Sequence, residues 1–218
     1  MPKNHNKIVL DLEFNPIRQP ELREFARHEI IEIGAVKLND RLETVSTFQK
    51  YIKPMYNEIE PQITHLTGIS AATLENCGSF GEVMNDFIGW IGSEPHTFYS
   101  WSNTDKHVIC DEIELKYPEE YDYDIFFVHW VDLQRIYQRK MGFMKPMGLS
   151  NALGTLKIYF AGTEHGALAD AINTAEIMRF MCDREKMKQA KHSAVTFNES
   201  VSSGGFSIGN IPIKRKKG

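Results

Sequence analysis

The first fifty residues alternate apolar and polar positions in short runs that turn-forming residues separate, a pattern typical of β-strands. The run from Lys7 to Phe14 is rich in branched apolar residues and ends at Asn15-Pro16, which predicts a buried strand. Residues 29–39 and 43–52 alternate in the same way on either side of Asn39-Asp40. Because this pair is typical of turns, we expect the two segments to form a β-hairpin.

Helical spacing of apolar residues dominates from residue 58 onward. It predicts short helices at 58–68 and after Ser70, and a longer amphipathic helix from Phe80 that ends at Gly92. Further strands are expected at 97–101 and 125–131, and further helices from Asn103-Thr104 and over 132–141, 149–157 and 166–183. Strands followed by alternating helices indicate an α/β fold, a mixed five-stranded sheet flanked by helices.

Length and composition are those of one globular domain. The chain has 218 residues, of which 42% are hydrophobic, enough to bury one core. The strand and helix pattern stops after residue 183, so we expect a domain at 1–183 and a flexible, basic, Ser/Gly-containing tail at 184–218. Continuation of the last helix to about residue 191 is left open, because predicted boundaries are uncertain by a few residues.

Charge is divided unevenly between these two parts. Residues 184–218 carry eight Lys or Arg against two Glu, a net charge of +6, which leaves −10 on residues 1–183 and −4 on the whole chain. An acidic body does not attract a polyanion through its overall field, so metal ions and local donors would have to do so. We interpret the acidic stretch Asp111–Asp124 as a solvated helix end and loop, away from any substrate. Glu29 and Glu32 are expected to pair with Lys or Arg on a neighbouring element, with a position near such metal ions as the alternative.

The three cysteines, Cys77, Cys110 and Cys182, form no C-x-x-C pair, which favours buried thiols without a disulfide in a reducing compartment. Residues 1–6 lack the apolar core of a signal peptide, and no uncharged apolar run approaches membrane-spanning length. We therefore expect a soluble, cytoplasmic protein that does not associate with membranes.

Candidate chemistry lies on the first strand and at the starts of two helices. Asp11 and Glu13 share one face of the strand, because successive strand residues alternate between faces. Asp105 falls in the first turn of a helix, and Asp170 follows His165 in the early turns of the last predicted helix. Carboxylates suit a hard cation such as Mg²⁺, whereas no cysteine or second histidine completes a zinc-type shell. The set predicts a divalent-metal site and phosphodiester hydrolysis.

Each of these motifs has an ordinary structural explanation when taken alone. A D-x-E motif on a strand is usually two solvent-facing acids, and H-x-x-x-x-D near a helix start is usually a helix cap with an acid favoured by the helix dipole. Together the five residues occur in a consistent order on a strand, a helix start and a helix. We therefore favour the functional interpretation for Asp11, Glu13, Asp105, His165 and Asp170.

The same arrangement over residues 7–181 resembles the DEDDh 3′-to-5′ exonucleases, relatives of polymerase proofreading subunits with a ribonuclease-H-like fold. The segments HEIIEIGAV, FQKYIKP, ITHLTGIS and YSWSNTD are most similar to the histone-mRNA and small-RNA 3′ exonucleases and to bacterial sporulation-inhibitor-type exonucleases. The resemblance implies two Mg²⁺ or Mn²⁺ ions bound by Asp11, Glu13, Asp105 and Asp170, with Asp11 shared. It also implies that His165 is the general base and that nucleoside 5′-monophosphates are released.

The family also indicates where the substrate would lie. Phe14 and Trp101 are candidates for stacking on a base, with a core position as the alternative for each. Thr67, Gly68 and Ile69 match the family's LTGI segment near the substrate 3′ end, with an ordinary helix C-cap as the alternative.

We expect a single-stranded or frayed 3′ end as the substrate, with RNA favoured over DNA. The alternatives are a proofreading or repair exonuclease acting on DNA, and a non-catalytic regulatory module that binds nucleic acid on the same fold.

Overall fold

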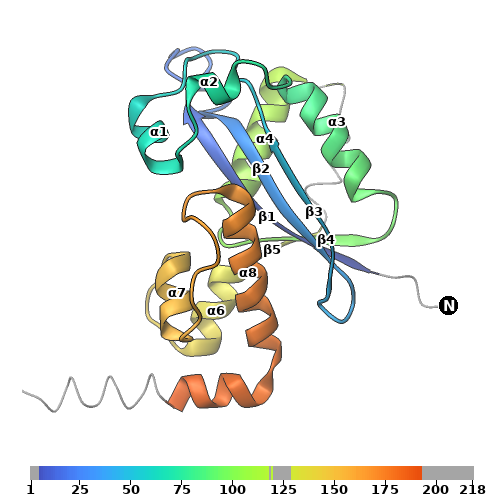
Figure 1. Cartoon of the computed structure of the whole chain (residues 1–218), viewed down its shortest axis with the longest axis vertical. Coiled ribbons are helices and arrows are strands. Elements are labelled where there is room, and N and C mark those ends of the chain that lie inside the picture. The colour runs from blue at the N-terminus through green and yellow to red at the C-terminus, as the bar shows by residue number, and fades with distance from the viewer. Residues whose placement is uncertain (1–4, 118, 120–128, 193–218) are drawn as a thin grey trace, which may run out of the picture.

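The computed structural model describes residues 5–117, 119 and 129–192, and a five-stranded sheet lies at its centre (Figure 1). The strands are β1 (Asn6–Pro16), β2 (His28–Leu38), β3 (Thr44–Tyr51), β4 (His96–Ser100) and β5 (Trp130–Asp132). Their order is β3-β2-β1-β4-β5. The pairs β1–β2 and β2–β3 are antiparallel, whereas β1–β4 and β4–β5 are parallel. The predicted mixed five-stranded sheet is confirmed.

The predicted hairpin between the second and third strands is also present. The side chain of Asn39 accepts hydrogen bonds from the backbone N–H groups of Arg41 and Glu43, at 2.9 and 3.0 Å, and so closes the turn. The described part of the fifth strand is Trp130–Asp132, which overlaps the predicted range 125–131 at residues 130 and 131 and extends one residue beyond it. Residues 125–128 of the predicted strand lie outside the described residues.

Helices of the described chain flank this sheet, with the labels of Figure 1. They are α1 (Pro61–Thr67), α2 (Ala71–Leu74), α3 (Phe80–Ile91), α4 (Thr104–Lys116), α6 (Leu133–Met141), α7 (Leu149–Thr155) and α8 (Ala167–Cys182). Their ends follow local chemistry: Pro61 begins α1, and Gly68, with φ 74°, ends it. Ser79 and Glu82 form a reciprocal capping box at the start of α3.

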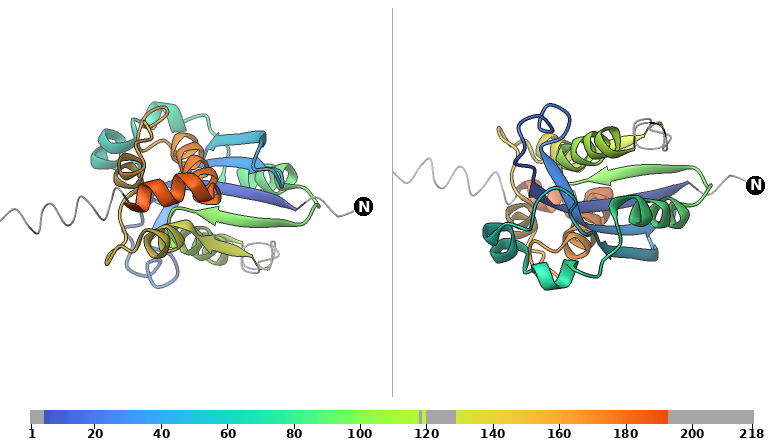
Figure 2. Two further views of the ribbon diagram at one scale, coloured as in Figure 1. Left: turned by 90° about the horizontal axis from the view of Figure 1, so that it is seen from below. Right: turned by 90° about the horizontal axis from the view of Figure 1, so that it is seen from above.

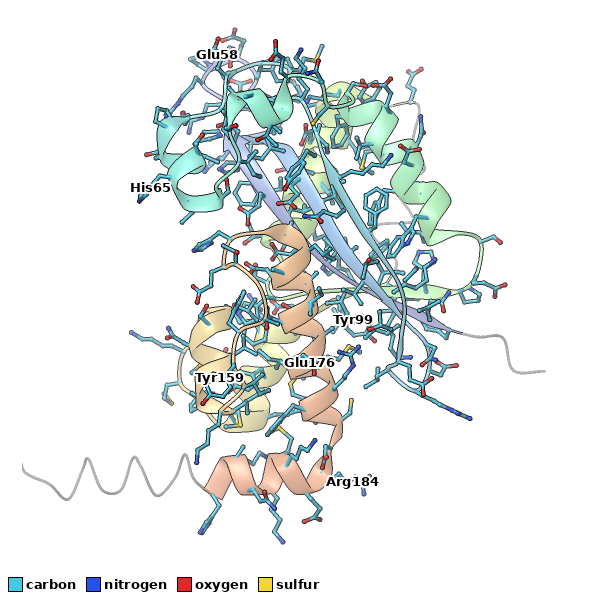
Figure 3. The ribbon with its side chains drawn as sticks, viewed as in Figure 1. Glu58, His65, Tyr99, Tyr159, Glu176 and Arg184 are labelled. Atoms are coloured by element: carbon cyan, nitrogen blue, oxygen red, sulfur yellow. The ribbon has the colours of Figure 1, made fainter. Side chains whose placement is uncertain are left out.

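Side chains of β1 alternate between the two faces of the sheet, and each face packs against its own layer of helices. Ile8, Leu10 and Leu12 point to one face of the sheet and pack with α3 and α4. Val9 points to the other face, where its core cluster includes residues of α6, α7 and α8. The two views in Figure 2 show these helix layers from opposite sides, and Figure 3 shows the side chains that fill the space between sheet and helices. Asp11 and Glu13 are in register with Val9 and therefore lie on the α8 side.

The start of α8 packs against the backbone of β2 at Gly34. A Cβ atom on Gly34 would lie 2.0 Å from the backbone nitrogen of Leu168 and 2.1 Å from the carbonyl carbon of Ala167. Glu32, two residues earlier on β2, accepts a hydrogen bond from the backbone N–H of Ala167 at 3.1 Å. Only glycine permits this approach, and Glu32 holds the first turn of α8 in place.

The last helix does not simply continue beyond residue 183. Asp183 leaves the helical conformation, and its side chain accepts hydrogen bonds from the backbone N–H groups of Glu185 and Lys186, both at 3.1 Å. A separate helix over 184–192 then crosses the end of α8, as Figure 1 shows; Arg184 is labelled in Figure 3. Its Met187 is buried in the core on the α8 side. Residues 193–218 lie outside the described residues.

The acidic stretch at the end of α4 is not solvated throughout, which corrects the interpretation of Asp111–Asp124. Glu112 is fully buried, accepts a hydrogen bond from the backbone N–H of Ile30 at 2.6 Å and lies 2.7 Å from Lys116 Nζ. Burial raises the pKa of Glu112 to about 7, although Lys116 opposes the rise. Lys116 also pairs with the buried Glu29 at 3.0 Å, so the predicted Lys or Arg partner of Glu29 is confirmed.

Within the described residues, none of the helices is both long and apolar enough to span a bilayer. The three cysteines are free. Cys110 is buried as predicted, whereas Cys77 is half-buried and Cys182 is exposed, so the expectation of buried thiols is wrong for these two.

Candidate active site

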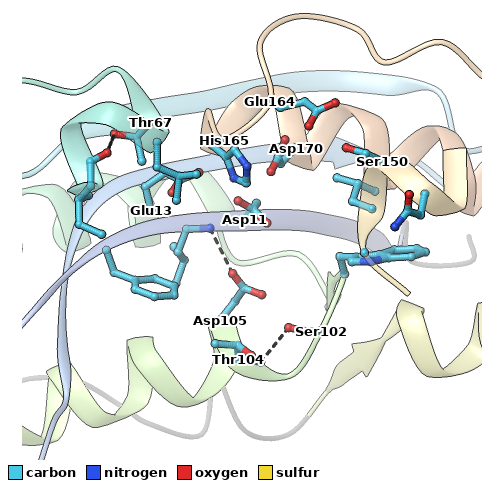
Figure 4. Close-up of a pocket in the computed structure, with 18 residues that line it drawn as sticks. Asp11, Glu13, Thr67, Ser102, Thr104, Asp105, Ser150, Glu164, His165 and Asp170 are labelled. Atoms are coloured by element: carbon cyan, nitrogen blue, oxygen red, sulfur yellow. Dashed lines mark hydrogen bonds between the residues drawn. The ribbon is translucent and has the colours of Figure 1, made fainter. Parts of the chain in front are cut away.

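The five candidate residues line one cleft of about 530 Å³ between β1, α1, α4, α7 and the start of α8 (Figure 4). Asp11 and Glu13 enter it from β1, Asp105 from the first turn of α4, and His165 and Asp170 from the end of the preceding loop and the start of α8. Chain segments more than 90 residues apart thus meet at the face of β1 that alternation assigns to Asp11.

Asp105 is attached to the central strand by a backbone hydrogen bond. Its Oδ1 accepts from the N–H of Leu12 at 3.2 Å, and the residue is 6% exposed. Leu12 points its side chain into the α3–α4 core, while its backbone holds Asp105 between Asp11 and Glu13 along the strand. Figure 4 shows this bond and the carboxylate of Asp105 directed toward the cleft.

His165 and Asp170 approach Glu13 closely. One possible metal-ligating atom from each of these three residues lies within 4.8 Å of the other two. His165 is exposed and has a φ of 60°, a left-handed conformation that is uncommon for a residue with a side chain. The Asp170 oxygen Oδ1 is buried and has no hydrogen-bond partner among the described residues.

The loop that carries His165 is anchored to α8 by Asn173. This residue is fully buried, and its Nδ2 donates to the carbonyl oxygens of Ala161 and Ala169, at 2.9 and 2.8 Å. Its Oδ1 accepts from the backbone N–H of Ala161 at 3.0 Å. The loop is therefore tied to the helix turn that follows Asp170, so that His165 and Asp170 are positioned together.

Burial and mutual repulsion make the four carboxyl groups weak acids. Burial, followed by the charges of Asp105 and Asp170, raises the pKa of Asp11 well above its usual value. Burial is also the largest cause that raises the pKa of Glu13 to about 8 and that of Asp105 to about 7. The pKa of Asp170 is raised to about 6 by burial, against the lowering effect of His165. At neutral pH such a cluster ionises fully only when a cation compensates its charge.

These features fit a divalent cation. The cleft supplies hard oxygen ligands, including the unpartnered Oδ1 of Asp170, and none of its lining residues is a cysteine. Glu13 and Asp170 lie within reach of a common ion, and Asp11 lies between them and Asp105 (Figure 4).

The predicted substrate contacts fall into two groups. Phe14, Thr67 and Trp101 line the cleft, whereas Gly68 and Ile69 line an adjoining pocket together with Thr67. Phe14 is half-buried, with its ring 4.8 Å from that of His28. Trp101 is 6% exposed, and its Nε1 donates to the carbonyl oxygen of Met147 at 3.0 Å. Substrate binding by these five residues stays a prediction.

The structure adds residues to the cleft that no sequence motif indicated. Glu164 precedes His165, and Ser150 and Asn151 come from the first turn of α7. The sequence predicts a helix over 149–157, but no spacing connects that helix with the carboxylates. The predicted Lys or Arg partner of Glu32 is wrong: Glu32 instead accepts from Gln49 Nε2 at 2.7 Å and from the start of α8. Hydrogen-bond donors of this kind can stabilise a buried carboxylate in place of a Lys or Arg partner.

Comparison with known proteins agrees with this geometry. The RNase_T exonuclease family model matches residues 8–178. ERI1 exoribonuclease 2 of Mus musculus is 34% identical over 170 residues, covering 67% of this chain and 24% of that protein. ERI1 exoribonuclease 3 of Homo sapiens is 29% identical over 189 residues, covering 83% of this chain and 54% of that protein. The chain thus spans less than two thirds of the length of either relative.

Among solved structures, the nuclease domain of 3'hExo, a DEDDh family member bound to rAMP, superposes with a TM-score of 0.69 at 24% identity. The match covers 81% of this chain and 91% of that one. The predicted ribonuclease-H-like fold is confirmed. This chain belongs to the RNase_T exonuclease family, and its resemblance to the DEDDh exonucleases is confirmed.

Proposed function

We propose that this protein is a divalent-metal-dependent 3′-to-5′ exonuclease that removes nucleoside 5′-monophosphates from the single-stranded or frayed 3′ end of RNA. The observation that carries the proposal is the assembly of Asp11, Glu13, Asp105, His165 and Asp170 in one cleft. Family membership supports hydrolysis, and the exoribonuclease names of both relatives favour RNA over DNA.

Asp11, Glu13, Asp105 and Asp170 would hold two ions, Mg²⁺ or Mn²⁺, with Asp11 shared between them. When bound, such ions supply positive charge that stabilises the phosphoryl oxygens and lowers the pKa of water. The protein contributes the fixed geometry: Leu12 holds Asp105, and Gly34 allows α8 to bring Asp170 close to β1.

His165 accepts the proton of the attacking water at a ring nitrogen. The water oxygen forms a new bond to phosphorus, and the bond from phosphorus to the 3′ oxygen of the penultimate nucleotide breaks. The departing oxygen takes a proton from solvent, so the products are a nucleoside 5′-monophosphate and a strand shortened by one residue with a free 3′ hydroxyl. Phe14 and Thr67, which both line the cleft, would accept the terminal nucleoside.

A direct test uses matched RNA and DNA oligonucleotides labelled at the 5′ end, with Mg²⁺ or Mn²⁺ or with a chelator. We expect a ladder of products that shorten from the 3′ end, faster for RNA, and no products with a chelator or with a blocked 3′ end. Faster digestion of DNA would favour the proofreading or repair alternative. Binding without hydrolysis under all metal conditions would instead make the protein a non-catalytic module.

A further inference from the structure

A second cavity, of about 450 Å³, adjoins the carboxylate cleft on the α6 side. Ser102 and Thr104 line both spaces, so only this short segment before and at the start of α4 separates them. The remaining wall consists mainly of polar residues from the first turns of α4 and from α6: His107, Asp132, Gln134, Arg135, Gln138 and Arg139. None of these residues belongs to the set that the sequence motifs indicated.

The two cavities differ in the charge of their walls. The cleft is lined by five carboxylates and His165, without any lysine or arginine. The second cavity has two arginines and one carboxylate, that of Asp132. The guanidinium of Arg139 has no hydrogen-bond or ion-pair partner that the described part of the chain provides. Arg135 lies 3.4 Å from Asp132, whose Oδ1 also accepts from the backbone N–H of Arg135 at the start of α6. The wall is therefore net positive, which favours an anion.

Several hydrogen bonds fix this wall to the cleft. The backbone N–H of Gln134 donates to the carbonyl oxygen of Trp101 at 3.1 Å. Gln134 Nε2 and Trp101 Nε1 both donate to the carbonyl oxygen of Met147, at 2.9 and 3.0 Å. The start of α6 thus has a fixed place relative to Trp101, which lines the cleft, and the arginines of α6 are held at a defined distance from the carboxylates.

The order of groups along the cleft gives the direction in which a strand would leave. Thr67 and Glu13 lie toward one end and Ser102 and Ser150 toward the other, with Asp11 between them (Figure 4). With the terminal nucleoside at the Thr67 end, the scissile phosphate meets the carboxylates, and the strand on its 5′ side leaves past Ser102. It then enters the second cavity.

The geometry points to the second cavity as a phosphate-binding subsite for the nucleotides on the 5′ side of the scissile bond, with Arg135 and Arg139 as the cationic donors. This inference rests on the proposed exonuclease function. An arginine fork matches the geometry of a phosphate group, and the exposed side chains of both residues can reach a passing strand. Such a subsite would offset the repulsion between the phosphates of the substrate and the acidic domain, whose cleft contains five carboxylates.

The test compares a double variant, Arg135→Gln with Arg139→Gln, with the wild type on two substrates. One is an unstructured RNA of eight nucleotides, and the other is a nucleoside 5′-phosphate p-nitrophenyl ester, which is too short to reach the second cavity. We expect KM for the RNA to rise about tenfold or more with little change in kcat, since two charge-assisted contacts are lost. The slope of log affinity against log salt should become shallower by about 1.4, at about 0.7 per phosphate contact on a single strand. Hydrolysis of the ester should not change.

Arg41→Gln is the matched control, because Arg41 is an exposed arginine in the turn between β2 and β3, outside both cavities. It should leave both KM and the salt slope as in the wild type. Equal melting temperatures would show that the double variant folds normally. A loss of the same size on the ester, or an unchanged KM and salt slope on the RNA, would overturn the subsite.

Chemical neutralisation of the strand identifies the phosphates concerned. Methylphosphonate linkages at the second and third positions from the 3′ end should weaken wild-type binding, measured by fluorescence anisotropy, and should cancel the difference between wild type and double variant. Additive losses would contradict the assignment. If the wild type binds but hydrolyses none of the substrates, the proposed function fails, while the anisotropy series still decides the subsite.

Discussion

Gly34 of β2 lies directly beneath the backbone nitrogen of Leu168 in α8, so closely that a Cβ atom would be 2.0 Å from it. Gly34 is also the partner of Asp11 across the β1–β2 ladder. The close approach that brings Asp170 to the site therefore occurs at the strand position opposite Asp11. The residue that permits it carries no functional group.

The substitution Gly34→Ala should impair both stability and activity. The obstructing atoms belong to the backbone, so α8 has to move, and overpacking of this kind costs about 1–3 kcal/mol. Displacement of Asp170 by about 1 Å should reduce kcat by about a hundredfold. Thermal unfolding and single-turnover hydrolysis measure the two effects. Gly89→Ala is the control, because a Cβ there meets nothing within 4 Å and alanine favours the helix. A fully active Gly34→Ala variant would contradict the predicted role of this packing.

Metal-free protein should lose stability as the pH rises from about 4 to about 8. The folded-state pKa values of Glu13, Asp105 and Asp170, about 8, 7 and 6, lie above the values near 4 of unfolded carboxyl groups. The folded state therefore binds more protons in this range, and its advantage disappears as the pH passes through the raised pKa values. Asp11→Asn removes one of the repelling charges and should make the decline smaller.

Calorimetry in a chelator, at several pH values, measures this decline for both proteins. Millimolar Mg²⁺ or Mn²⁺ should raise the melting temperature of the wild type and should raise that of Asp11→Asn far less. The metal-free variant should melt at or above the metal-free wild type. Equal metal-induced shifts would place the ion elsewhere, and Asp11 would no longer be the shared ligand.

Replacement of His165 should abolish most activity without abolishing metal binding. His165→Ala should lower the rate by about two to four decades, the usual effect of losing a general base, and His165→Asn should not restore it. The asparagine variant is the better matched of the two, because asparagine tolerates the left-handed backbone conformation at this position. Titration calorimetry with Mn²⁺ separates the roles, since His165 also lies within ligating distance of Glu13 and Asp170. A loss of metal affinity as complete as that of Asp11→Asn would make His165 a ligand instead.

Asn173→Ala should release the loop that carries His165. It removes three hydrogen bonds and leaves the N–H and C=O of Ala161 without their partner, at a cost of about 1–3 kcal/mol. We expect kcat to fall about tenfold or more and metal affinity to remain, because the proposed ligands on β1 are unaffected. The neighbouring Thr174→Val is a suitable control: Thr174 is equally buried, but its hydroxyl has no partner in the described structure. Similar rate losses in both variants would indicate a general packing effect.

Much of this site can be read from the sequence because its elements are locally encoded. Alternation along β1 places Asp11 and Glu13 on one face, and turn-forming residues precede the helices that carry Asp105 and Asp170. The side-chain cap expected around Asn103-Thr104 is not formed, since neither α4 nor α8 has a side-chain hydrogen bond at its N-cap. The partners of Glu32 could not be predicted in this way. One is the side-chain amide of Gln49 on β3, and the other is the backbone N–H of Ala167, 135 residues away, a kind of donor that has no sequence signature. The buried position of Glu112 was missed for a related reason: Lys116 is a local partner four residues later on α4, but only tertiary packing brings the backbone N–H of Ile30 to Glu112.

The alternation of β1 also makes the site dependent on strand register. Ile8, Leu10 and Leu12 fill one core while Asp11 faces the cleft, so a slip of one residue against β2 would exchange acids and leucines between the two faces. Such a slipped strand would bury charges and expose apolar surface. It would also remove Asp11 and Glu13 from the cleft together, so a slipped register does not preserve part of the site. Formation of the core and assembly of the carboxylates are therefore a single event. In a partly denatured sample, the residual activity should be proportional to the fraction of molecules with the correct strand register. The activity of each folded molecule should not change.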